Sequence, residues 1–328
     1  MMLLLIAPMN LTKKGKIIYM RKELFVSTLL LFICLGASSQ DTTKQKKTED
    51  TDISKLLEEQ LKAEDKNKTQ FVSATFKTTR LVNGHTIETT GKGVLDVKIS
   101  HRFGPLGGPL GGAYNFFGLD VATMRMGFDY ALGKNVTIGV GRTTFKKELD
   151  GFIKWRPVRQ ATGGSSFSWV LVTGMSVYTF KNTDPQNKAS FSSRVGYYYQ
   201  SIFGRKFSKR FSLQLSPTLV HRNKVETGDV NDIYAIGIGS RFKLSKRTAF
   251  VIDYFPVFNR PKNSITKDAF SVGFDIETGG HVFQLHFSNA TGMNERAFIT
   301  DTQDSWGRGE IRFGFNLSRV FTVKKNRN

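Results

Sequence analysis

The sequence predicts an all-β protein, a transmembrane up-and-down antiparallel β-barrel of about twelve strands with a short N-terminal periplasmic extension. Between residues 93 and 321, segments of about ten residues place large apolar groups on one parity and small or charged groups on the other. The connections between these segments alternate between long and short. After residue 40 no apolar run approaches the ~20 residues of a membrane helix, whereas a membrane strand needs only about 9–11.

The first 39 residues predict an export signal. From Met20 onward the chain has a basic start, an apolar stretch and a small-residue end. Ala37 and Ser39 suit the small-residue positions before a signal-peptidase cut, which would leave Gln40 as the new N-terminus. Residues 1–19 are interpreted as lying before the true translation start, because the sequence from Met20 onward is already a sufficient signal. A retained membrane anchor is the alternative.

Composition restricts the chemistry of the mature chain. Among 328 residues, 39% are hydrophobic, and the formal net charge is +21. Cys34 is the only cysteine and lies in the signal, so we expect neither a disulfide nor thiolate chemistry after cleavage. Excess positive charge is one feature of nucleic-acid binders. In an exported chain with strand-parity charges, anionic lipopolysaccharide or anionic solutes are the expected counterparts, and no nucleic acid is expected.

Two segments precede the predicted barrel, which spans residues 92–321. Residues 40–70 are polar and charged and predict a linker, with a short helix near residues 52–61 as the alternative. Residues 71–91 predict a hairpin around Asn83-Gly84, a strong turn pair. The pattern leaves open whether this hairpin is a plug or an element of the outer rim.

Alternating residues define each predicted strand. In the segment after residue 269, for example, Phe270, Val272 and Phe274 oppose Ser271 and Asp275. A soluble sandwich also alternates, but it would need a second sheet and crossing connections. The expected strands lie near residues 95–103, 123–130, 137–141, 153–156, 168–176, 194–200, 211–216, 234–241, 250–254, 270–276, 283–288 and 311–318.

The connections predict the orientation of the barrel. Long loops are expected near 104–121, 143–150, 179–190, 222–231, 257–268 and 289–309, short turns near 132–135, 204–210, 245–247 and 277–280, and an intermediate one near 158–165. Outer-membrane barrels place long loops outside the cell and short turns in the periplasm, so both termini should be periplasmic. The aromatic stripe ending at Phe321 resembles the signal read by the barrel-assembly machinery, and residues 322–328 form a tail beyond it.

Charged residues on the inward parity are the candidate functional residues. One interpretation is a closed, charge-paired interior, and another is a narrow, Arg-lined pore for small anionic solutes. Many inward glycines would leave room inside or relieve strand curvature. The Gly/Pro-rich loop 104–121 could constrict the pore or stay on the surface. The lumen-lining candidates are Arg102, Arg125, Asp129, Arg194, Arg241, Asp253, Asp275, His286 and Arg312.

No catalytic or metal site is predicted. Asp275, His286 and Ser288 share a parity from which a triad can be drawn, but no nucleophile elbow is present and lumenal hydrogen bonding explains them better. His281 and His286 are five positions apart, so they point to opposite faces of a strand. We therefore expect no enzyme activity, metal or cofactor.

Three stretches of sequence resemble a family of bacterial outer-membrane β-barrel proteins of unknown function. They are SLQLSPTLVHRN (212–223), GFDIETGGHVFQLHFSN (273–289) and GEIRFGFNLSRVF (309–321), and the resemblance extends over residues 76–321. It implies a barrel in the outer membrane. It implies no activity and no site residues.

These observations lead to a functional expectation. The leading interpretation is a narrow pore or passive transporter for small solutes, with anions favoured, in the outer membrane of a Gram-negative bacterium. The second is a structural or surface-interaction barrel without transport. The third, a lipid-modifying barrel enzyme, would need a Ser/His pair at the outer rim. Expected partners are outer-membrane lipid, lipopolysaccharide and the barrel-assembly machinery.

Overall fold

The computed structural model describes residues 69–181 and 190–324. The predicted signal segment and nearly all of the 40–70 linker lie outside the described residues, as does the end of the C-terminal tail. Within the described ranges, no helix is long and apolar enough to cross a membrane.

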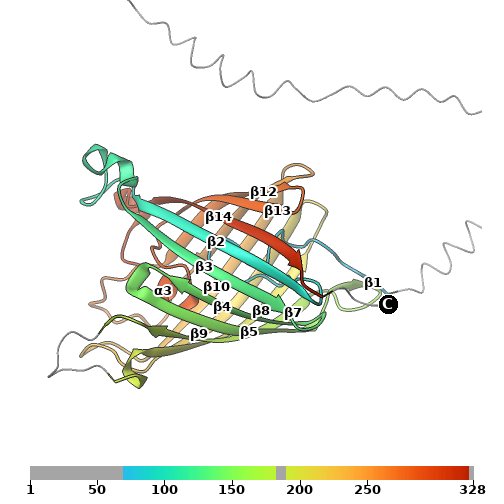
Figure 1. Ribbon diagram of the computed structural model, residues 1–328, viewed down its shortest axis with the longest axis horizontal. Helices are drawn as coiled ribbons and strands as arrows, with labels where there is room; N and C mark the ends of the chain where they lie inside the picture. The colour runs from blue at the N-terminus through green and yellow to red at the C-terminus, as the bar shows by residue number, and fades with distance from the viewer. Residues whose placement is uncertain (1–68, 182–189, 325–328) are drawn as a thin grey trace, which may run out of the picture. The chain divides into compact units, whose positions relative to one another are not determined.

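Twelve strands of the described chain form one closed antiparallel barrel, which confirms the predicted fold class (Figure 1). Each barrel strand pairs with the next along the chain, and β14 pairs with β2 to close the cylinder. The barrel strands are β2 (Val94–Pro105), β3 (Ala122–Ala131), β4 (Val136–Thr143), β5 (Glu148–Val158), β7 (Ser168–Tyr178), β8 (Val195–Lys206), β9 (Phe211–Arg222), β10 (Asp232–Lys243), β11 (Thr248–Phe255), β12 (Ala269–Thr278), β13 (His281–Ser288) and β14 (Arg312–Thr322). Two short strands, β1 (Gln70–Phe71) and β6 (Ala161–Thr162), pair outside it.

The period-two pattern separates the two faces of the wall. On β12, Phe274 is 44% exposed on the outer face, whereas its neighbours on the other parity, Ser271 and Asp275, are buried inside. Outer side chains of adjacent strands pack against each other, as in the stacked rings of Trp169 and Phe203, whose centroids are 6.1 Å apart. An apolar outer face of this kind suits lipid rather than water.

The connections alternate as predicted, with one exception. The β4–β5 connection was expected to be long but comprises only residues 144–147. It closes as a tight turn with a left-handed Lys146 (φ 50°), and Lys147 N donates to Thr144 O at 3.2 Å. We call the rim with the β3–β4, β8–β9, β10–β11 and β12–β13 turns the short-turn end. The opposite rim, which carries the long loops and also the β4–β5 turn, is the long-loop end. β2 begins and β14 ends at the short-turn end.

The lumen is occupied from the short-turn end by residues 74–90, which we call the plug segment. Phe76, Leu81, Val82 and Ile87 of this segment are buried in the core of the barrel. Its tip is the turn predicted at Asn83-Gly84, and Leu81 N donates to Gly84 O at 2.9 Å. Of the two positions that the sequence left open, the structure has the one inside the barrel.

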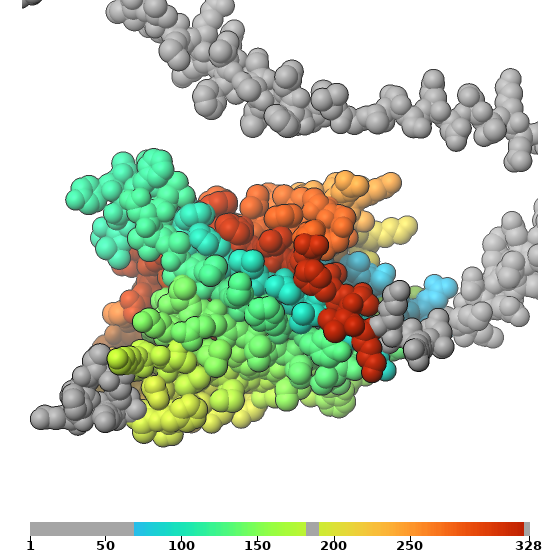
Figure 2. Space-filling view, in the orientation of Figure 1, coloured from blue at the N-terminus to red at the C-terminus, as the bar shows by residue number. Residues whose placement is uncertain are grey.

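The long-loop end contributes a second inward element. The β13–β14 connection folds into the lumen and forms α3 (Glu295–Thr300), in which every residue is buried. The helix begins because the Asn294 side chain caps it and accepts from Ala297 N at 2.8 Å. In contrast, the β2–β3 loop stays on the surface as a projecting lobe (Figures 1 and 2), with Tyr114 97% exposed, so the inward alternative for that loop is wrong.

Inward glycines accommodate large side chains rather than an open passage. A Cβ added at Gly139 would lie 2.2 Å from the ring of Phe152, and one at Gly174 would lie 2.3 Å from the ring of Tyr198. A wall glycine also makes room for the plug segment, since a Cβ added at Gly239 would lie 2.2 Å from Leu81. The glycine parity therefore marks where aromatic rings and the plug segment approach the wall.

Candidate functional site: the plugged lumen

The two inward elements meet at a buried ion pair. Arg80 of the plug segment donates from Nη1 to Glu295 Oε1 at 2.9 Å and from Nη2 to Oε2 at 3.2 Å. This is the bidentate geometry in which guanidinium and carboxylate interact most strongly. Both side chains are buried, so the pair closes the lumen with groups that water cannot easily solvate.

His85 lies against this ion pair. Its Nε2 is 3.0 Å from Arg80 Nη2, a group that can only donate, so Nε2 accepts and the ring is neutral. Tyr198 Oη lies 3.4 Å from the same nitrogen, and the Phe152 ring contacts the imidazole edge at a centroid distance of 4.4 Å. Burial and the nearby Arg80 charge hold the pKa of His85 well below its ordinary value.

The tip of the plug segment is fixed to the barrel wall. Asp253 Oδ2 accepts from the backbone N–H groups of Asn83, at 2.7 Å, and Gly84, at 3.1 Å. The Asn83 side chain donates to Ser271 Oγ at 2.9 Å and accepts from Arg102. Asp253 thus acts as the acceptor for a turn that presents two adjacent donors.

Four cations of the inner wall bind backbone carbonyls instead of carboxylates. They are Arg102, Lys154, Arg156 and Arg241, and no ion pair joins any of them to another residue of the described ranges.

Three of these cations bind the plug segment through its carbonyls. Lys154 Nζ donates to Glu88 O at 2.6 Å, and Arg241 Nη1 donates to Ala74 O at 2.9 Å. Arg156 Nη1 reaches Ile87 O at 3.5 Å.

Arg102 joins both inward elements. It donates to the Asn83 side chain of the plug and from Nη1 to Ala290 O at 2.9 Å and Gly292 O at 2.7 Å in the β13–β14 connection. The plug segment and this connection together supply the acceptors that the wall cations need.

Other inward charges are neutralised within the wall and rim. Arg125 Nε donates to Asp150 Oδ1 at 2.9 Å, and Lys98 lies between Asp96 and Asp129. Near the long-loop end, Arg312 Nη2 donates to Asp304 Oδ2 at 2.6 Å. These pairs contribute no net positive charge to the lumen.

The sequence-predicted lumen residues fall into two groups. Arg194 lies in a short 3-10 turn, η3 (Ser192–Arg194), before β8 begins, and is half-buried at the long-loop end. The others point inward and are buried: Arg102, Arg125, Asp129, Arg241, Asp253, Asp275, His286 and Arg312.

Sequence reasoning missed the residues that close the lumen. Arg80, His85 and Glu295 lie outside the alternating strands, so no parity argument assigns them a direction. The available signals were ionisable side chains on both flanks of the Asn83-Gly84 turn, and a Glu-Arg pair directly after a capping Asn294 in the last long loop.

The side chains considered for catalysis are not arranged as a relay. His286 Nε2 accepts from Arg102 Nε at 3.3 Å, Ser288 Oγ accepts from Ser271, and Asp275 accepts from Gln284. Within the described ranges, no group of three or more His, Cys, Asp or Glu residues could hold a metal ion.

A cavity remains at the short-turn end, between the plug segment and the wall. It has a volume of about 330 Å³ and is lined by residues that include Lys77, Glu88, Asp96 and Glu277. An ion pair between Lys77 and Glu277 spans it from plug to wall.

The closed barrel, its apolar outer face and its filled lumen define a membrane-bound β-barrel with an internal plug. Residues 76–321 match the model of a family described as a membrane bound beta barrel domain, DUF5777. The chain belongs to this family, which confirms the resemblance predicted from the sequence. No curated protein matches the chain.

Solved structures of similar architecture share little sequence with this chain. An outer membrane channel from Pseudomonas putida F1 has 11% identity and a TM-score of 0.41, with 71% of this chain and 97% of that one covered. OmpF of Salmonella typhi has 6% identity and a TM-score of 0.35, covering 70% and 97%. LpxR of Salmonella typhimurium has 11% identity and a TM-score of 0.34, covering 70% and 99%. Likeness at this level carries nothing about activity.

Proposed function

We propose that this protein is a plugged outer-membrane channel: a passive passage for small anionic solutes that is closed at rest by its own plug segment. Opening requires the plug segment to leave the lumen or to shift within it. The barrel then provides the passage and the plug segment controls it.

The observation that carries this proposal is the pairing of the wall cations. Arg102, Lys154, Arg156 and Arg241 donate to carbonyls or amides of the inward elements rather than to carboxylates. When the plug segment moves out, Lys154, Arg156 and Arg241 lose these acceptors and face a water-filled lumen as cations. A lumen lined by cations lowers the barrier for anions and raises it for cations.

The membrane, export and partners form part of the same proposal. An apolar outer face on a closed barrel fits the bacterial outer membrane, because closed barrels satisfy every backbone polar group in lipid. An export signal in residues 1–39 and the aromatic last strand would deliver the chain to the barrel-assembly machinery. We propose passage rather than catalysis as the role of the inward polar groups.

A structural barrel without transport is the second candidate. The density of the interior favours it, because Arg102, Arg125 and Lys154 are almost wholly buried and the plug segment packs into the core. A permanently closed interior would need no movement of the plug segment. The two candidates therefore differ in whether that segment moves.

A reversible disulfide between plug and wall separates these candidates. A Cβ built at Gly204 on β8 would lie 2.6 Å from Ile87 Cγ2. The two Cβ atoms are then within roughly 4 Å, a separation that a disulfide bridges. In the mature chain, from which the predicted signal and its Cys34 have been removed, the double variant Ile87→Cys, Gly204→Cys has no competing cysteine and should form this bond cleanly.

The measurement is conductance of the purified mature double variant in a planar bilayer under applied voltage. We expect no ionic current when the disulfide is formed and discrete current steps after it is reduced. The single variant Ile87→Cys should conduct under both conditions. Silence of the reduced double variant and of the wild-type protein would instead establish the structural barrel. Equal conductance in the oxidised and reduced states would mean that ions do not pass the plug.

A further inference from the structure

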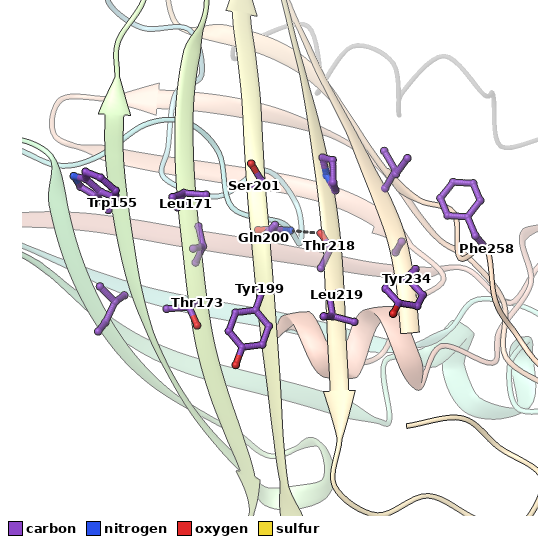
Figure 3. Close-up of a pocket in the computed structure, with 15 residues that line it drawn as sticks. Trp155, Leu171, Thr173, Tyr199, Gln200, Ser201, Thr218, Leu219, Tyr234 and Phe258 are labelled. Atoms are coloured by element: carbon purple, nitrogen blue, oxygen red, sulfur yellow. Dashed lines mark hydrogen bonds between the residues drawn. The ribbon is translucent and has the colours of Figure 1, made fainter. Parts of the chain in front are cut away.

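The outer wall of the barrel carries an apolar groove of about 820 Å³ (Figure 3). Strands β5, β7, β8, β9 and β10 form it, with Trp155 and Phe258 at opposite ends of the view. No charged side chain of the described structure lines the groove. Its size lies within the range of about 300–1,000 Å³ that small-molecule sites occupy.

Short side chains in the middle of two cross-strand rows create the hollow. One row runs Ile153, Thr173, Tyr199, Leu219 and Tyr234, and the next runs Trp155, Leu171, Ser201, Pro217 and Ile236. Thr173, Ser201 and Pro217 are the small members, and the larger ones stand around them. Figure 3 shows Tyr199, Leu219 and Tyr234 side by side along one edge.

The floor of the groove lies at an interruption of the β8–β9 ladder. The β8–β9 ladder pairs Gln200 with Thr218 and resumes at Phe203 with Leu215. Pro217 lies in the interval and has no N–H to donate, which explains the interruption. Pro217 cannot donate a hydrogen bond to the neighbouring strand. Its apolar ring faces the groove instead.

We propose that this groove is a binding site for one acyl chain of a membrane lipid. The site lies on the membrane-facing side of the wall, where acyl chains are the surrounding medium and a soluble partner has no access. It begins near the short-turn end of β5 at Trp155 and reaches the long-loop end of β10 at Tyr234. The groove runs across strands that tilt by about 35–45°, so it lies oblique to the membrane normal and passes through part of the thickness of the membrane.

One substitution fills the site and a second controls for its side effect. Ser201→Phe places a ring over the floor, whereas Ser201→Ala leaves the hollow open. Both variants remove the hydrogen bond that Trp169 Nε1 donates to Ser201 Oγ at 2.8 Å. A difference between the two variants therefore reports on the hollow and not on that bond.

The full-length protein is reconstituted in vesicles of palmitoyl-oleoyl phosphatidylcholine, re-extracted into detergent, washed and weighed by native mass spectrometry. We expect the wild type and Ser201→Ala to retain one phosphatidylcholine per barrel, and retention in Ser201→Phe to fall about tenfold. A wild type free of lipid, or equal retention in Ser201→Phe, would overturn the proposal. Heat-modifiable gel migration verifies that each variant is a folded barrel.

Discussion

At the scale of single residues, the closure of the lumen depends on charged side chains that are buried away from water. Arg80 and Glu295 are 215 positions apart and satisfy each other only because two inward elements meet. Removing one partner of a buried pair leaves an uncompensated charge, whereas removing both is far less costly. The pair should therefore fix the position of the plug segment.

Replacement of Glu295 tests this role. Glu295→Gln should weaken the seating of the plug segment by about 3–5 kcal/mol, because Arg80 stays buried without a counter-charge. The measurement is limited proteolysis of residues 74–90 in the reconstituted protein, which should become faster. The double variant Arg80→Met, Glu295→Met is the control and should regain most of the protection. Unchanged protection in Glu295→Gln would show that other contacts hold the plug segment.

His85 predicts a pH dependence of the same contact. Its pKa is lowered in the seated plug by burial and by Arg80, then Lys154, and it would return to about 6.5 when the plug segment is solvated. A released plug then binds more protons than a seated one below pH about 6.5, so acidification favours release. Seating is fully stable above that pH and weakens as pH falls through it.

The matching experiment measures plug protection between pH 8 and pH 5. Protection should decrease on acidification in the wild type, with less change in His85→Gln, whose amide can still accept from Arg80. Glu295 and Tyr198 also face the imidazole, and Glu295 would pair with a charged ring at 3.5 Å. An identical pH profile in His85→Gln would assign the dependence to another group.

The residue pattern of a strand predicts which side chains point inward, but it does not predict which distant segments those side chains contact. Parity alone predicts that Arg102, Asp253 and His286 point inward, because side chains alternate along a strand. It gives no information on which groups they meet. Asp253 binds a turn 169 positions away, and that contact depends on the plug segment entering the barrel.

At the scale of elements, the strands are predictable and the inward pieces are not. Each strand repeats its pattern over a span long enough to identify, whereas α3 has only six residues and is buried all round. An element of that length carries no helical periodicity to detect. The β4–β5 turn was missed for a related reason, since the polar start of β5 resembles a loop.

The outer face of a strand should reject charge. Phe274→Arg places a cation near the middle of β12 on the lipid side and should cost about 2–4 kcal/mol. Phe274→Leu keeps the position apolar and is the control. Unfolding by denaturant in lipid vesicles measures the difference. Similar stability of the two variants would contradict the assignment of this face to the membrane.

The alternation of connections predicts which rim faces the outside of the cell. An epitope tag inserted at Gly228, in the β9–β10 loop, should be detected on intact cells. One inserted between Ser245 and Lys246, in a short turn, should be detected only after the membrane is permeabilised. The reverse pattern would mean that the barrel is inverted.

At the scale of the whole molecule, the barrel is filled from both ends by two elements that come from different parts of the chain. The plug segment precedes the first barrel strand, and the α3 loop precedes the last, so each is tethered at a point where the barrel closes on itself (Figure 1). Overall sequence composition indicated an excess of positive charge. It could not show that several inner cations bind carbonyls, because carbonyl acceptors leave no trace in composition.

This distribution of charge predicts the ion selectivity of the opened barrel. Arg156 and Arg241 lose their plug acceptors on opening and form no ion pair with another described residue, so they should favour anions in the passage. Arg125 should contribute little, because Asp150 neutralises it. The reduced Ile87→Cys, Gly204→Cys protein in a salt gradient should therefore show an anion-selective reversal potential.

Adding Arg156→Glu and Arg241→Glu to that protein should move the reversal potential towards cations, because both substitutions reverse the charge lining the passage. Arg142→Glu is the matched control: its side chain is exposed on the outer face of β4 and donates to Thr179 Oγ1 at 3.0 Å. This control should leave selectivity nearly unchanged. A cation-selective parent protein, or an equal shift from Arg142→Glu, would mean that ions do not pass the wall cations that the plug segment covers at rest.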